Sequence, residues 1–125
     1  MIYGIGTDLV DPARIARSLD RHGDAFAKKV LADTEWPEFL KHAKPSIFVA
    51  KRFAAKEAFA KAAGTGLRVP VSFSNISVLH DPQGKPYFEF CEVLMEWMSQ
   101  RGIVAHHLSI SDELTMANAF VILEK

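Results

Sequence analysis

The longest helical stretch in this sequence runs from Ser46 to Gly66, and it limits what the rest of the chain can form. Ala, Lys, Glu and Phe dominate the stretch, and neither Gly nor Pro interrupts it before Gly64. Ser46 follows a proline and is expected to cap the helix, while the two glycines supply the left-handed conformation in which helices end. We therefore expect one long helix that is buried over much of its surface.

Charged residues interrupt this otherwise apolar helix. Arg52 and Lys56 lie four residues apart, as do Glu57 and Lys61, so each pair projects from one stripe of the helix and could meet a single ligand. An ordinary surface pair between Glu57 and Lys61, worth roughly 0.2–0.5 kcal/mol, explains the second spacing equally well. The helix alone favours that simpler interpretation.

Composition points to one domain over residues 1–125, because 125 residues at 49% hydrophobic can build one core. Lys plus Arg and Asp plus Glu both number 15, so no excess charge indicates nucleic acid or an anionic membrane as partner. Cys91 is the single cysteine, which excludes an internal disulfide. No signal peptide or membrane-spanning stretch is recognisable, and we expect a cytoplasmic protein.

The N-terminal residues predict a strand that ends in Thr7–Asp8. Gly4 and Gly6 within it mark places where another backbone or a ligand approaches closely. A helix is expected to start at Asp11, whose carboxylate can cap it and which a proline follows. Asp8 could merely complement the positive end of that helix, but Asp11 is better placed to do so. Asp8 is thus left at a strand end with no local partner.

The remaining elements favour an α+β fold, a mostly antiparallel sheet wrapped around one long central helix. In the last strand, Ala117 and Ala119 indicate that a helix packs closely on one face, and the Ala-rich central helix is the candidate. The other expected elements are a helix over 25–31, a helix starting at Asp33, strands over 76–80 and 87–90, a helix ended by Gly102, and a strand through Leu108 and Ile110.

Three segments must be read together. They are G-I-G-T-D-L-V-D-P-A-R-I from Gly4, F-V-A-K-R-F-A-A-K-E-A-F-A-K-A-A-G-T-G from Phe48, and H-L-S-I-S-D-E from His107 with A-N-A-F-V-I-L-E. In this combination the chain resembles the holo-acyl-carrier-protein synthase family of 4′-phosphopantetheinyl transferases. The D-P-Q-G-K-P-Y turn from Asp81 is also similar to the family pattern. The resemblance covers essentially the whole chain, and it outweighs the simpler interpretation of the helix charges.

The resemblance implies an enzyme that moves the phosphopantetheine arm of coenzyme A onto a serine of apo acyl carrier protein. The other product is adenosine 3′,5′-bisphosphate, and the reaction supports fatty acid biosynthesis. By resemblance, Asp8 and Glu57 are ligands of a catalytic Mg²⁺, and Lys61 reaches a bridging phosphate oxygen. A site with only two protein carboxylates suits Mg²⁺, because this ion keeps several of its water ligands. Either Glu57 or a water on the metal takes the serine proton.

The resemblance also assigns binding residues. It implies a homotrimer with active sites at the subunit interfaces, which explains spare apolar residues such as Phe120 and Ile122 on the last strand. His106 is expected to be a solvated strand-end residue, and Asp112, where many relatives have His, receives no role. Residues matching coenzyme A-binding positions are Lys44, Arg52, Lys61, Lys85, Pro86 and His107. Residues matching or extending a basic surface for the acidic carrier protein are Arg14, Arg17, Arg21 and Lys28.

Two alternative functions remain open. A metal-dependent nucleotide phosphohydrolase would use the same carboxylates and Lys61 with water as the nucleophile. A non-catalytic coenzyme A-binding module would use Glu57 and Lys61 only as an ion pair. Nucleic-acid binding is disfavoured, because the charges balance and the aromatic residues fall at core spacing.

Overall fold

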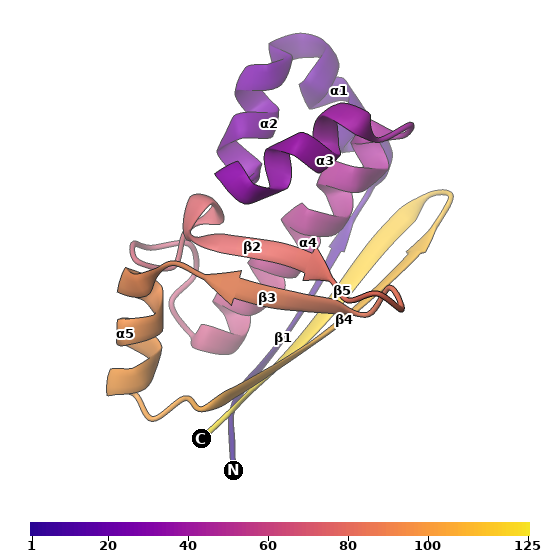
Figure 1. The fold of residues 1–125 in the computed structure, drawn as a ribbon. Coiled ribbons are helices and arrows are strands. Elements are labelled where there is room, and N and C mark those ends of the chain that lie inside the picture. The colour runs from indigo at the N-terminus through magenta and orange to yellow at the C-terminus, as the bar shows by residue number, and fades with distance from the viewer.

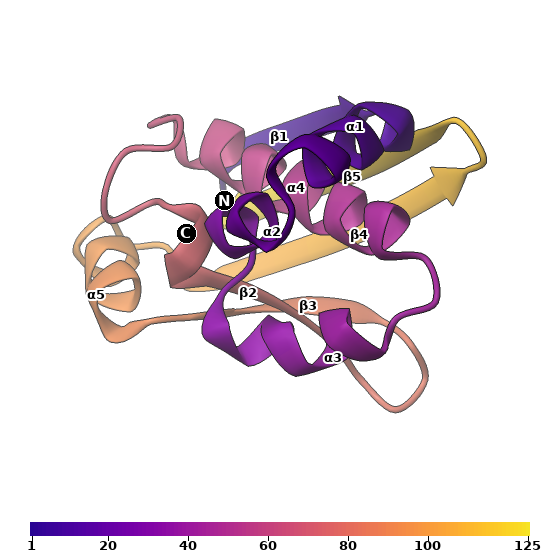
Figure 2. The same ribbon diagram turned by 90° about the horizontal axis from the view of Figure 1, so that it is seen from above.

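The computed structural model describes residues 1–125, which form an α+β fold around the helix α4 (Pro45–Ala63). Two antiparallel sheets pack on this helix, and the chain termini lie side by side (Figure 1). Figure 2 shows α4 between the two sheets. Most side chains of α4 are buried, so one hydrophobic core forms around it. The predicted fold class is therefore confirmed, with two sheets in place of one.

The ends of α4 match the sequence prediction at one end only. Gly64 adopts φ +79° and ends the helix, as expected. The predicted N-cap at Ser46 is wrong, because Pro45 is already the first helical residue and Lys44 precedes it without a side-chain cap. Proline fits this position, since its φ is preset and its missing N–H has no partner in the first turn.

The larger sheet has the strand order β1-β5-β4 and contains β1 (Ile2–Val10), β5 (Met116–Glu124) and β4 (Ala105–Glu113). It lies so close to α4 that a Cβ atom at Gly6 would come within 1.9 Å of the Ala58 carbonyl oxygen. The close approach predicted from the glycines is thus made by the helix backbone. Ala117 and Ala119 are fully buried on the same face, as predicted.

The predicted end of β1 is wrong. The strand continues to Val10, and Asp8 pairs in register with Ala119. Asp11 then caps α1 (Pro12–His22), accepting a hydrogen bond from the Ala13 N–H at 2.9 Å. Asp8 is therefore held inside a sheet, which fixes its backbone more firmly than a strand end would.

The other elements close the core at its two ends. After a 3-10 turn (Asp33–Glu35) comes α3, and a hairpin and α5 follow α4 (Figure 1). None of the helices combines the length and the apolarity needed to span a membrane. The bounds of these elements are α2 (Asp24–Val30), α3 (Trp36–Lys41), β2 (Ile76–His80), β3 (Pro86–Phe90) and α5 (Glu92–Gln100).

The outer face of the larger sheet carries exposed apolar side chains. Ile5 and Leu9 on β1 are 58% and 62% exposed, and Phe120 on β5 is 39% exposed. Alternation along the strands places these residues opposite the face that α4 covers. The sheet is thus apolar on both faces, although α4 covers only one of them.

Candidate active site

Asp8 and Lys61 meet at the edge of the larger sheet. Lys61 Nζ lies 3.2 Å from Asp8 Oδ1 and donates a hydrogen bond to the Thr7 carbonyl oxygen at 2.9 Å. The Lys61 side chain is half exposed, whereas that of Asp8 is 17% exposed. The last turns of α4 thus bring a half-exposed cation to a carboxylate that β1 holds in place.

Glu57 lies one helical turn before Lys61 and is half-buried. Burial and the nearby Asp8 carboxylate raise its pKa above the ordinary value, while the positive charges of Lys61 and Arg14 oppose the shift. Glu57 forms no ion pair of its own, because Lys61 is directed to Asp8. The surface pair between Glu57 and Lys61 that the spacing allowed is therefore absent.

Asp8 and Glu57 together offer carboxylate oxygens, the ligands that hard cations prefer. The structure has no group of three or more His, Cys, Asp or Glu side chains that could hold a metal. The Asp8 charge nevertheless raises the pKa of Glu57, and a cation between the two carboxylates would offset that repulsion; Mg²⁺ binds few protein carboxylates and retains its waters, so the pair fits it. The donor chemistry at Asp8 and Glu57 is consistent with such an ion.

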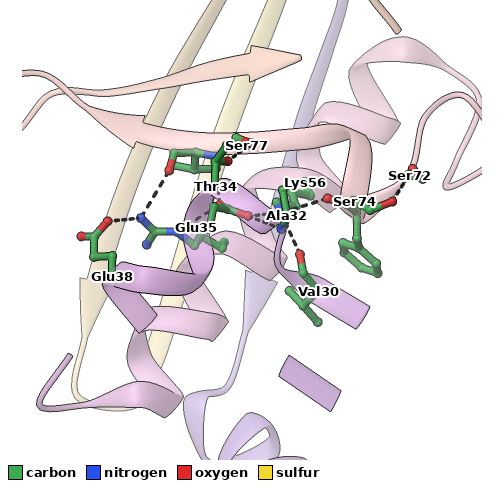
Figure 3. Close-up of polar contacts among 12 residues, drawn as sticks. Val30, Ala32, Thr34, Glu35, Glu38, Lys56, Ser72, Ser74 and Ser77 are labelled. Atoms are coloured by element: carbon green, nitrogen blue, oxygen red, sulfur yellow. Dashed lines mark hydrogen bonds and ion pairs between the residues drawn. The ribbon is translucent and has the colours of Figure 1, made fainter. Parts of the chain in front are cut away.

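The other predicted stripe of α4 is buried around a carboxylate that sequence reasoning missed. Glu35 is 1% exposed and forms ion pairs with Lys56 (Nζ to Oε1, 2.5 Å) and Arg52 (Nε to Oε2, 3.1 Å). Lys56 also donates to the carbonyl oxygens of Val30 and Phe73 at 2.7 and 3.0 Å (Figure 3). The group that Arg52 and Lys56 both bind is therefore the Glu35 carboxylate of the protein itself, and no external ligand is needed. No local pattern in D-T-E-W-P-E signals that the glutamate is buried.

Burial shapes the charges of this network. It lowers the pKa of Lys56 to about 8, against the opposing attraction of Glu35. Burial lowers the pKa of Arg52 as well, with Glu35 and Glu38 opposing the shift. The three hydrogen bonds that Lys56 donates satisfy all three of its N–H groups, which is the arrangement a buried ammonium requires.

Arg52 lines a cavity of about 200 Å³ between α3, α4 and β2. Its Nη2 atom lies 3.2 Å from Glu38 Oε2 at the rim. Burial and the Arg52 charge lower the pKa of His80 there. The lining residues are Glu38, His42, Phe48, Lys51, Arg52, His80 and Ile110. Three of the predicted coenzyme A residues are next to lining residues. The Lys44 N–H donates to His42 Nδ1, and Pro86, which follows Lys85, pairs in register with His80.

The two histidines of β4 lie on opposite faces of the sheet, and one of them differs from the prediction. His106 is half-buried, with its ring centroid 5.0 Å from that of Phe90, so the expectation of a solvated residue is wrong. His107 is exposed on the outer face of the sheet, and its Nε2 atom lies 2.5 Å from Glu124 Oε1. It does not line the Arg52 cavity of its own chain. Strand alternation decides this, because adjacent residues face opposite sides.

The predicted basic surface lies on α1. Arg14 and Arg17 line a polar cavity of about 170 Å³, together with Ser18, Arg21 and His22. Lys28 is not part of it, since its ammonium lies 5.3 Å from the centroid of the Trp36 ring. The Arg14 charge partly opposes the rise in the Glu57 pKa, so this surface borders the carboxylate pair.

Comparison with known proteins now decides the family. The family model described as "4'-phosphopantetheinyl transferase superfamily" matches residues 4–115. The chain belongs to this superfamily. The match includes Asp8, Glu57 and Lys61 as well as the basic residues of α1, so the resemblance carried by the three segments is confirmed.

Relatives within the 4′-phosphopantetheinyl transferase superfamily agree along the whole chain. A holo-[acyl-carrier-protein] synthase of Nitrosomonas europaea is 72% identical, with all of both chains covered. The crystal structure of a holo-[acyl-carrier-protein] synthase from Neisseria meningitidis superposes with a TM-score of 0.97 at 51% identity, also with full coverage of both. That of the Helicobacter pylori protein in complex with coenzyme A has a TM-score of 0.82 at 30% identity, covering 96% of this chain and 99% of that one.

Proposed function

We propose that this protein is a holo-[acyl-carrier-protein] synthase, which transfers 4′-phosphopantetheine from coenzyme A to a serine of apo acyl carrier protein. Adenosine 3′,5′-bisphosphate leaves, and the holo carrier serves fatty acid biosynthesis in the cytoplasm. The observation that carries the proposal is the pairing of Asp8 with Lys61 beside the half-buried Glu57, in a chain of this superfamily. Residues 1–125 act as one transferase domain.

Asp8 and Glu57 hold Mg²⁺ in this proposal. When bound, the ion offsets charge on the pyrophosphate of coenzyme A. Lys61 is half exposed and ends a flexible side chain, so it can leave Asp8 Oδ1 for a bridging phosphate oxygen. Either Glu57 or a water that the ion would hold accepts the serine proton.

The Arg52 cavity receives the 3′-phosphate of coenzyme A. Arg52 and Lys51 supply positive charge, and the cavity volume of about 200 Å³ is ample for one phosphate group. Pro86 pairs in register with His80, which lines the cavity, and the Lys44 N–H donates to Nδ1 of the lining residue His42 at 3.1 Å. Lys44, Lys85 and Pro86 therefore extend the coenzyme A site around one rim.

The exposed apolar face of the larger sheet supports a homotrimer. Ile5, Leu9 and Phe120 would be buried by neighbouring copies, which removes apolar area that a monomer leaves in water. His107 lies on the same outer face, so it can reach the coenzyme A site of a neighbouring copy although it is remote from its own. The active sites then lie at the subunit interfaces.

The α1 surface receives the carrier protein. Arg14 and Arg17 line a cavity without any acidic residue, and such a surface attracts and orients an acidic partner. Its position beside Glu57 directs the bound carrier towards the carboxylate pair.

Intact-mass spectrometry of apo acyl carrier protein tests the function. The carrier is incubated with this protein, coenzyme A and Mg²⁺, beside samples with chelator, with Glu57→Gln and with Lys61→Met. We expect a gain of one phosphopantetheine with the wild type and none with chelator or Glu57→Gln. Lys61→Met should slow the transfer by about 100-fold, the scale of losing one donor to a developing charge.

Other outcomes identify the alternatives. Hydrolysis of coenzyme A or a nucleotide with an unchanged carrier would establish a phosphohydrolase. Binding of coenzyme A without turnover, left intact by Glu57→Gln, would establish a non-catalytic module. In either case the proposed transfer is wrong.

A further inference from the structure

Arg52 has two carboxylate partners in opposite environments. Glu35 lies at its Nε atom with no side-chain exposure, whereas Glu38 lies at its Nη2 atom with a side chain 56% exposed. The Nε and Nη2 distances to the two carboxylates are nearly equal, 3.1 and 3.2 Å. The two partners therefore differ mainly in how firmly they are held.

Glu35 is fixed from every side. Its Oε1 accepts a hydrogen bond from the Ala32 N–H at 2.8 Å and pairs with Lys56, and its Oε2 accepts one from the Val78 N–H at 2.9 Å (Figure 3). A buried carboxylate with this many partners cannot leave without exposing unpaired charge. Glu35 thus holds the guanidinium in place whatever enters the cavity.

Glu38 has no such restraint. Arg52 Nη2 is its only polar partner, and Glu38 stands apart from the Glu35 cluster in Figure 3. Although Arg52 is only 4% exposed, the Glu38 carboxylate is largely solvated, so this pair is held less firmly than the wholly buried pair with Glu35. Glu38 is therefore free to turn into solvent.

The second cation of the cavity shows the same arrangement. Lys51 Nζ lies 3.1 Å from Asp112 Oδ1, and the two side chains are 33% and 38% exposed. Asp112 extends from β4 and does not line the cavity itself, but it pairs with Lys51, which does. Each cation that faces the cavity is thus already paired with an exposed carboxylate.

We infer that Glu38 and Asp112 are placeholders, which pair with Arg52 and Lys51 while the cavity is empty and give way to a phosphate group of the ligand. This inference rests on the proposed binding of coenzyme A at this cavity. A phosphate dianion carries more charge than a carboxylate and can accept two parallel hydrogen bonds from a guanidinium, so it displaces a weakly held carboxylate. The two carboxylates keep the cations paired and ordered before the ligand arrives, at some cost in affinity.

Neutral variants of the placeholders test the inference by calorimetry with two probes, coenzyme A and dephospho-coenzyme A, which lacks the 3′-phosphate. Glu38→Gln and Asp112→Asn should each tighten coenzyme A binding about two- to fivefold, the range that an exposed ion pair allows. The gains should multiply in the double variant and shrink at high salt. Dephospho-coenzyme A should bind all variants equally. Glu96→Gln on α5, far from the cavity, is the matched control.

Each result decides the matter. Weaker or unchanged coenzyme A binding in both variants overturns the inference, as does an equal gain for the two probes, which would be a general charge effect. If the wild type transfers phosphopantetheine but the variants show none of the predicted changes in binding, the inference is wrong and the proposed function stands. If the phosphate-specific gains appear without any transfer, the proposed enzyme activity fails and the inference stands. A wild type that binds neither probe overturns both.

Discussion

Lys56 and Glu35 form an ion pair that is closed to solvent on both sides. Nζ lies 2.5 Å from Oε1, and neither side chain is exposed. Together with Arg52, the pair ties α4 to the 3-10 turn before α3 and, through the Val78 N–H, to β2. Two charges of the central helix thus connect it to the segments that pack around it.

Lys56→Met should be strongly destabilising, because it leaves Glu35 buried with one cation fewer. We expect a loss of about 3–5 kcal/mol in the free energy of unfolding, measured by urea denaturation. Lys29→Met, at an exposed position of α2, is the matched control and should change stability by no more than about 0.5 kcal/mol. Equal losses of unfolding free energy in the two variants would show that removing Lys56 from the buried ion pair costs no more than removing an exposed lysine.

Gly6→Ala should disrupt the contact between β1 and α4. The new Cβ atom would lie 1.9 Å from the Ala58 carbonyl oxygen, so strand or helix must shift. Overpacking of this kind costs about 1–3 kcal/mol or more. Thermal unfolding can be compared with Thr7→Ala on the exposed face of the same strand, and a wild-type midpoint for Gly6→Ala would contradict the close packing.

Charge reversal on α1 should impair use of the carrier protein without affecting coenzyme A binding. For Arg17→Glu we expect a KM for apo acyl carrier protein at least about tenfold higher and a weaker salt dependence, because attraction of an acidic partner is lost. Lys29→Glu changes the charge equally on α2 and serves as the control. The assignment of this surface would be wrong if both variants raised the KM alike.

Acidification should destabilise the protein through His106. Burial lowers the pKa of this histidine in the folded state below the ordinary 6.5, and the His107 charge adds to the shift. Just below pH 6.5 the unfolded chain therefore binds more protons than the folded one, and the free energy of unfolding falls as pH falls. Urea denaturation at pH 7.5 and 5.5 measures the slope.

His106→Gln provides the comparison for that slope. This variant should lose less stability than the wild type between the two pH values, because the group that titrates is gone. Parallel pH profiles for the two proteins would mean that burial of the His106 ring has no effect on its pKa. His80, whose pKa is also lowered, keeps part of the slope in both proteins.

Local patterns were enough to predict the main elements. The Ala-rich stretch ended by Gly64 became α4, and the turn at Asp81 joined two antiparallel strands as expected. The error at Asp8 arose because strand length depends on pairing with β5, a segment more than 100 residues away. The expected solvation of His106 failed for the same reason, since Phe90 belongs to another sheet.

The sequence by itself determined the long helix, the fold class and the superfamily, because helix propensity, turn residues and motif spacing are local or ordered properties of the chain. Only the tertiary structure decided what each charge pairs with. Lys61 forms an ion pair with Asp8 instead of Glu57, and Lys56 and Arg52 form buried ion pairs with Glu35. The physical reason is that the energy of a charge depends on burial and on distant partners, and neither is visible in the residues that flank it.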